Sequence, residues 1–89
     1  MDKHQLHKRA RNAVKGAGSS QRDVARALDL NRSSVSRALR NVGLKYAAVQ
    51  ARIVSLLEGE PVERRSRYHG RSVEHRWIVG PREEPRSGA

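Results

Sequence analysis

The chain has 89 residues, of which 36% are hydrophobic, with one tryptophan and no phenylalanine or cysteine. This length allows one small domain with an aliphatic core, and the absence of cysteine excludes disulfides and thiolate metal sites. No apolar run approaches the roughly 20 residues that a membrane-spanning helix needs, and the residues after Met1 are polar where a signal peptide is apolar. We therefore expect a cytoplasmic protein with no membrane partner.

The charge of the chain predicts a polyanionic partner. Nineteen Lys and Arg residues against nine Asp and Glu residues give a formal net charge of +10. Residues 1–57 hold 12 basic and 3 acidic side chains, whereas residues 58–89 hold 7 and 6, so the anion-binding surface is expected in the first two thirds. Fifteen of the 19 cations are Arg, which suits bidentate contacts with phosphate or guanine, although a GC-rich genome produces the same bias.

The first predicted helix covers residues 4–15. Leu6, Ala10 and Val14 recur at helical spacing, and basic side chains occupy the rest of the cylinder. The segment GAGSS at 16–20 contains two glycines that are expected to end the helix. The pattern predicts a short basic amphipathic helix.

The second predicted helix begins near Gln21 and ends by Asp29. Ser20 lies where an N-cap is expected, and Asp23, three residues later, completes a capping box. The aliphatic residues of its buried side are Val24, Ala25, Leu28 and Leu30.

The third predicted helix runs from Arg32 to about Asn41. Asn31 is a natural N-cap for it, and Gly43 is expected to close it. Its inward-facing residues are only Val35, Ala38 and Leu39. This helix buries few residues and carries three arginines and three serines, so its polar face is expected to be a binding surface.

The fourth predicted helix, residues 45–58, has the strongest apolar face in the chain. Gly59 and Pro61 are expected to stop it. Its apolar residues recur at steps of three and four, and they are Tyr46, Val49, Ile53, Leu56 and Leu57.

After Pro61 the spacing of apolar residues changes from helical to alternating, which predicts a β-hairpin with a two-residue turn at His69 and Gly70. One face of the hairpin is expected to carry Val73, His75, Trp77 and Val79. An isolated hairpin is marginal in water, so it should pack on the helices or pair across a dimer. The chain is thus expected to comprise a helical domain at 1–59, a hairpin at 60–80 that serves as a wing or dimerisation element, and a disordered tail at 81–89.

The helix, turn and helix at residues 21–41 resemble the helix-turn-helix of the Lac-repressor and lambda-repressor/Cro families. Gln21, Ala25 and the run VSRAL at 35–39 stand at the matching places. Families of this type usually have glycine in the turn, where this chain has Asp29, a residue that tolerates the left-handed conformation better than most. The resemblance covers about a quarter of the chain. It implies a mainly α, four-helix Cro-like domain whose second motif helix lies in a DNA major groove.

The resemblance also implies which side chains meet DNA. The base-reading set is Arg32, Ser33, Ser36, Arg37 and Arg40. Helical geometry agrees, because these positions lie on the side opposite the apolar residues of the same helix. The phosphate-contacting set is Gln21, Arg22, Asn31, Lys15 and Lys45, and further basic residues that would raise affinity are Lys8, Arg9, Arg11 and Arg26. The alternative is an ordinary solvated helix face, which normally mixes in acids for pairing, whereas residues 30–57 contain none.

These patterns favour a sequence-specific double-stranded DNA-binding regulator, most like a phage or plasmid repressor that occupies a promoter in the bacterial or phage-infected cytoplasm, at the nucleoid. A homodimer is expected because one recognition helix covers few base pairs. Its interface is expected at Trp77, Ile78 and Val79, on an exposed strand edge, and at the outer side of the fourth helix. Two alternatives remain open. One is a DNA-bending architectural or recombination-directionality protein, and the other is an adaptor that binds RNA polymerase or another acidic protein.

No catalytic residue, metal, cofactor or small-molecule ligand is expected. His4 and His7 are one turn apart, but no cysteine or carboxylate cluster accompanies them. The glycines at 16–18 lack the strand and third glycine of a nucleotide-binding loop. A chain this short and polar leaves little room for a water-excluding pocket, so an enzyme is not expected.

The arginines of the hairpin have two interpretations. They could reach into an adjacent minor groove, or they could pair at the surface with Glu60, Glu63 and Glu74. The arginines concerned are Arg64, Arg65, Arg67 and Arg71.

Overall fold

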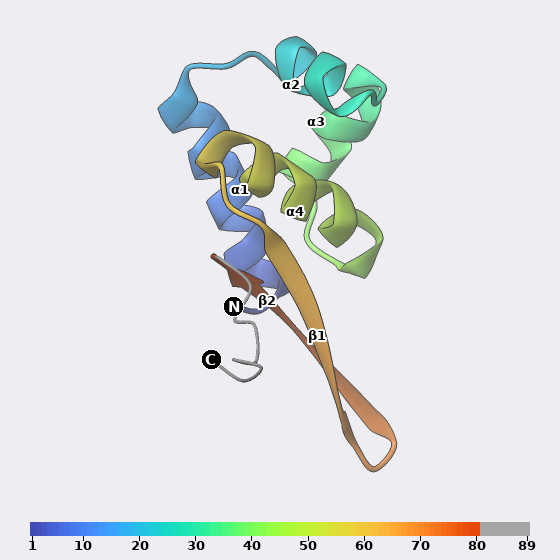
Figure 1. Cartoon of the computed structure of the whole chain (residues 1–89). Helices are drawn as coiled ribbons and strands as arrows, with labels where there is room; N and C mark the ends of the chain where they lie inside the picture. The colour runs from blue at the N-terminus through green and yellow to red at the C-terminus, as the bar shows by residue number, and fades with distance from the viewer. Residues whose placement is uncertain (81–89) are drawn as a thin grey trace, which may run out of the picture.

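The computed structural model describes residues 1–80, which form helices followed by a two-stranded antiparallel hairpin (Figure 1). The helices are α1 (Lys3–Ala17), α2 (Gln21–Leu28), α3 (Arg32–Arg40) and α4 (Leu44–Glu58), and the strands are β1 (Val62–His69) and β2 (Ser72–Val79). The predicted mainly helical fold with a C-terminal hairpin is therefore confirmed. The tail predicted at 81–89 lies outside the described residues. Within residues 1–80, no helix is both long and apolar enough to cross a membrane.

The helices and the base of the hairpin share one core. α4 crosses the middle of the molecule and packs against α1, α2 and α3, while β1 packs on α4 and β2 on α1 (Figure 1). Each fully buried aliphatic side chain contributes about 1.5–3 kcal/mol relative to exposure. The buried residues of this core are Leu6, Ala10, Val24, Ala25, Val35, Leu39, Ala47, Ile53, Val54 and Trp77.

The start of α1 is fixed by a capping box that the sequence analysis missed. The Asp2 carboxylate accepts a hydrogen bond from the Gln5 backbone N–H, and the Asp2 N–H donates to the Gln5 side-chain oxygen, each over 2.9 Å. The bond from Gln5 lowers the pKa of Asp2. At the other end, Gly16 lies within the helix and Gly18 is its C-cap, so only the second of the two expected stop signals ends α1.

The turn between α2 and α3 forms as predicted, with an aspartate in place of the usual glycine. Asp29 has φ 56° and ψ 45°, and it is the one non-glycine residue with positive φ within residues 1–80. The Leu30 N–H closes the turn by donating to the Ala25 carbonyl over 2.8 Å. Of the expected capping box, one half forms, because the Ser20 hydroxyl accepts from the Asp23 N–H over 3.1 Å.

Two details of the helical region differ from prediction. Gly43 does not close α3, which ends at Arg40 with Asn41 as C-cap, but is instead the N-cap of α4 with φ 142°. The buried face of α4 is also rotated from the expected one: Leu56 is 41% exposed, and Gln50 is fully buried. The buried residues of this face are Ala47, Gln50, Ile53 and Val54.

The hairpin turn is displaced by one residue from its predicted position. His69 pairs with Ser72, so the two turn residues are Gly70 and Arg71. Gly70 adopts φ 58°, the left-handed conformation that two-residue hairpin turns require and glycine adopts without strain. The predicted alternation persists, because Trp77 turns into the core whereas its neighbour Ile78 is exposed. Only the base of the hairpin meets the helices, and its outer part extends away from them (Figure 1).

Candidate nucleic-acid interface

The outward face of α3 carries the predicted base-reading residues. Val35 and Ala38 on the inner side are fully buried, and Leu39 is 6% exposed. On the outer side the exposed residues are Arg32, Ser33, Arg37 and Arg40, whereas Ser36 is half-buried. Within residues 1–80 these three arginines form no ion pair. The guanidinium groups are therefore available to an external anion or base edge.

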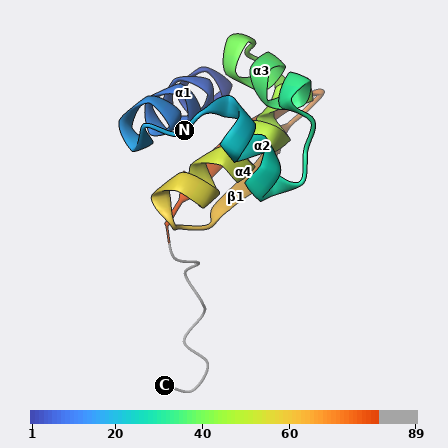
Figure 2. The same ribbon diagram turned by 90° about the horizontal axis from the view of Figure 1, so that it is seen from above.

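The structure brings members of the two predicted sets together in one open cleft. Lys15 at the end of α1, Gln21 at the start of α2 and Arg40 at the end of α3 line it, together with Arg11, Val14 and Leu39. Cationic side chains here lie beside the start of α2, where the positive end of the helix dipole also favours anions, although Ser20 already caps the Asp23 N–H and the Asp23 carboxylate is in the same turn. A phosphate group fits this combination of charges. Figure 2 shows α1 and α3 next to each other along one side of the molecule.

The other predicted phosphate contacts, Arg22, Asn31 and Lys45, are exposed but do not line this cleft. Asn31 occupies the N-cap position of α3, yet its side chain makes no capping hydrogen bond, so the cap expected from its amide is not formed. The Lys45 ammonium lies 5.8 Å from the centroid of the Tyr46 ring, within cation–π range.

Arg9 is already bound within the molecule. Its Nε lies 2.9 Å from Oε2 of Glu58, and its Nη2 lies 2.6 Å from Oε1 of the same carboxylate. This bidentate bond between α1 and α4 raises the pKa of Arg9 and lowers that of Glu58. Arg9 therefore links α1 to α4, and its guanidinium is less available to an external anion than the unpaired arginines are.

Side chains from α1 and α4 hold the C-terminal end of α3. The Gln50 amide Nε2 donates to the Ala38 carbonyl over 2.8 Å and to the Asn41 carbonyl over 2.7 Å. The His7 Nε2 donates to the Leu39 carbonyl over 2.7 Å, because a carbonyl oxygen can only accept. A helix leaves its last carbonyls without internal partners, and here neighbouring helices satisfy several of them.

Sequence reasoning missed this arrangement. Gln50 falls on the apolar side of α4, and a glutamine at that spacing signals nothing until the end of α3 is known to lie above it. His7 was considered only as a potential metal ligand. These bonds fix the orientation of α3 on the body of the protein.

The predicted dimer interface is wrong for Trp77. Its side chain is 2% exposed and belongs to the core of the monomer. Its backbone groups are also occupied, because its N–H donates to the Met1 carbonyl and the Met1 amino group donates to its carbonyl, each over 2.8 Å. Ile78, on the opposite face, is 42% exposed, and Val79 is half-buried against the core. Any interface at this strand would therefore use Ile78, not the indole.

Within residues 1–80, no group of three or more His, Cys, Asp or Glu side chains is placed to hold a metal ion.

No protein-family model, curated protein or solved structure matches the chain significantly.

Proposed function

We propose that the protein is a sequence-specific regulator that binds double-stranded DNA and reads bases with the outward face of α3. The observation that carries the proposal is the contrast between the two sides of that helix. Its inner side is buried and its C-terminal carbonyls are bound by α1 and α4, whereas its outer arginines have no ion-pair partner within residues 1–80. A helix held so firmly, with so many free donors, is suited to a major groove.

The spacing of the donors supports base reading. Arg32 and Arg37 are separated by about 7.5 Å along the helix axis, or about two base-pair steps, so each guanidinium can address a different guanine through O6 and N7. Ser33 and Ser36 are short, which allows the helix to approach the base edges closely. The cleft at Lys15 and Gln21 would hold a phosphate and fix the register of the helix in the groove.

The proposed biological role is that of a phage- or plasmid-type repressor in the cytoplasm that acts by occupying a promoter. Two copies on paired half-sites about one helical turn apart would supply the specificity that one short helix lacks. A DNA-bending protein would instead show a strong change of gel mobility when its site is moved along a fragment. An adaptor for an acidic protein would show no preferred DNA sequence.

A random-sequence selection at about 150 mM salt, followed by affinity measurements on variants, tests the proposal. Arg37→Ala should relax the preference at one base position and weaken specific binding by about 1–3 kcal/mol. Lys15→Ala should weaken all sequences equally, and its log affinity should fall less steeply with log salt.

The matched control is Arg9→Ala, which removes an arginine that Glu58 already engages and should leave sequence preference unchanged. Failure to enrich any motif, together with unchanged affinity in Arg37→Ala, would contradict the proposal and favour the adaptor.

A further inference from the structure

The outer part of the hairpin is exposed to an unusual degree for a β element. Residues 63–76, which we call the arm, are all exposed except the half-buried His75. A two-stranded hairpin without a covering layer is marginal in water, so a segment of this kind gains stability from something outside the monomer. Tyr68 illustrates the point, because it is 76% exposed beside its cross-strand partner Val73.

The net positive charge of the arm indicates that its partner outside the monomer is a polyanion. The arm contains five arginines and two glutamates, a formal charge of +3. Both glutamates are engaged: Glu63 lies 4.0 Å from Arg65, and Glu74 lies 3.1 Å from Arg76 and 3.4 Å from His69.

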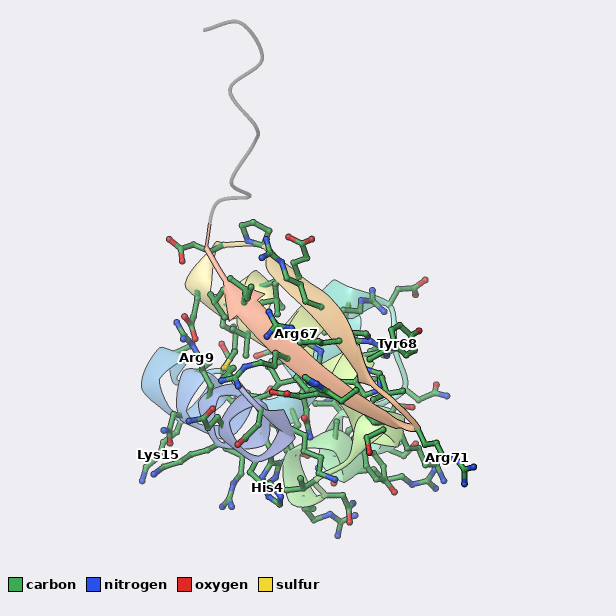
Figure 3. The ribbon with its side chains drawn as sticks, turned by 90° about the horizontal axis from the view of Figure 1, so that it is seen from below. His4, Arg9, Lys15, Arg67, Tyr68 and Arg71 are labelled. Carbon is green, nitrogen blue, oxygen red and sulfur yellow. The ribbon has the colours of Figure 1, made fainter. Side chains whose placement is uncertain are left out.

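The other three arginines of the arm, Arg64, Arg67 and Arg71, form no ion pair within residues 1–80. Arg71 is a turn residue and projects from the tip (Figure 3). The arm therefore presents free guanidinium groups up to its end.

In the view from above, the orange tip of the arm lies on the side of the molecule that carries α1 and α3 (Figure 2), while along the other axis it extends away from them (Figure 1). The hairpin leaves the core at Trp77, and Ser72 at the turn is five positions away along the strand. Five strand residues span about 17 Å. Half a turn of B-DNA is also about 17 Å, the distance from a major groove to the next minor groove.

We propose that the arm is a second DNA-binding element, which lies along the duplex flanking the site read by α3, with Arg71 at the adjacent minor groove and Arg67 at a phosphate. Arginine suits both positions, since a narrow minor groove concentrates negative potential and a guanidinium forms bidentate bonds to phosphate. This inference rests on the proposed DNA-binding function of α3.

A second copy of the chain fits the arm less well. A two-fold contact through the arm would place its positive charge against the same charge on its partner. Like charges that face each other across paired strands are destabilising, whereas a polyanion gains from every free arginine.

The test compares two duplexes that share the selected site, one ending at the site and one extended by about ten base pairs on each side. Wild type should bind the longer duplex about tenfold more tightly, as expected from two added phosphate-type contacts. The double variant Arg67→Ala/Arg71→Ala should lose this gain, yet enrich the same motif and bind the short duplex as wild type does.

The matched control, Arg65→Ala/Arg76→Ala, removes the same charge from arginines that are already paired, and it should keep most of the gain. Equal binding of wild type to both duplexes, with the motif still enriched, would overturn the arm's role and leave the function of α3 intact. If no motif is enriched at all, the proposed function itself fails. A lower sedimentation mass in Arg67→Ala/Arg71→Ala, measured without DNA, would also overturn the proposal and identify the arm as a contact between copies.

Discussion

Helix α3 and the arm both present arginines that form no ion pair within residues 1–80, but the fold holds the two elements in opposite ways. α3 is buried along its inner side, and Gln50 and His7 bind its terminal carbonyls. The arm is exposed on both faces and is joined to the body only at its base. On the proposed function, this difference means that one residue type serves two tasks. Base reading requires donors fixed to a fraction of an ångström, whereas contact with a uniform phosphate backbone requires only charge and reach.

The largest expected effect comes from cutting the connection between the two regions. Trp77→Ala should lower the free energy of unfolding by about 3–5 kcal/mol, because the indole fills the core shared by the hairpin and the helices. Helical circular dichroism during denaturation measures this loss. Tyr68→Ala, in the exposed arm, should change stability by no more than about 0.5 kcal/mol. If the helices of Trp77→Ala unfolded at the wild-type midpoint, the two regions would be independent units.

A smaller effect is expected from loosening α3 alone. Gln50→Leu keeps roughly the side-chain volume but leaves the Ala38 and Asn41 carbonyls without their donor, which should cost about 1–3 kcal/mol of stability. The selected DNA motif should also become less sharp, although Gln50 is buried and cannot touch DNA. Ala48→Leu, at an exposed position of the same helix, is the control. An unchanged motif in folded Gln50→Leu would show that the helix holds its position without this bond.

The smallest expected effect on stability concerns Arg9, the arginine that is paired with Glu58. Glu58→Gln removes the partner of Arg9 and should cost about 0.5 kcal/mol near neutral pH, since the pair is partly exposed. Bonding to Arg9 lowers the pKa of Glu58 below its usual 4.5, so this stabilisation is present above that pH and is lost as pH falls through the lower folded-state value. Denaturation curves at several pH values should show wild type and variant converging in acid. A gap that did not narrow as the pH was lowered would rule out this origin.

The sequence predicted best those features that neighbouring residues determine. The bounds of α2 follow from Ser20 and from the left-handed turn at Asp29, both of which act within one helical turn. The hairpin was recognised from alternation, but its turn was placed one residue early because Gly70 can be either the second turn residue, after His69, or the first, before Arg71. What decides between them is the pairing of the whole ladder.

Features that depend on distant partners could not be predicted. Trp77 looks the same in the sequence whether it faces a core or another copy, and only the packing of β2 against α1 separates the two cases. Gln50 is similar, because its buried position is tolerable only where the end of α3 supplies carbonyl acceptors. The exposure of Arg37 was easier to predict, because helical geometry alone places it on the side opposite Val35 and Leu39.

The absence of ion pairs at the outer side of α3, within residues 1–80, also bears on how this protein can change. Substitutions of the side chains of Arg32, Ser33 or Arg37 disturb no ion pair within residues 1–80, so on the proposed function a new operator preference can arise without a loss of stability. The outer residues of α3 can therefore be exchanged while the rest of the fold is unchanged. A library randomised at those positions should yield folded proteins with many different DNA preferences.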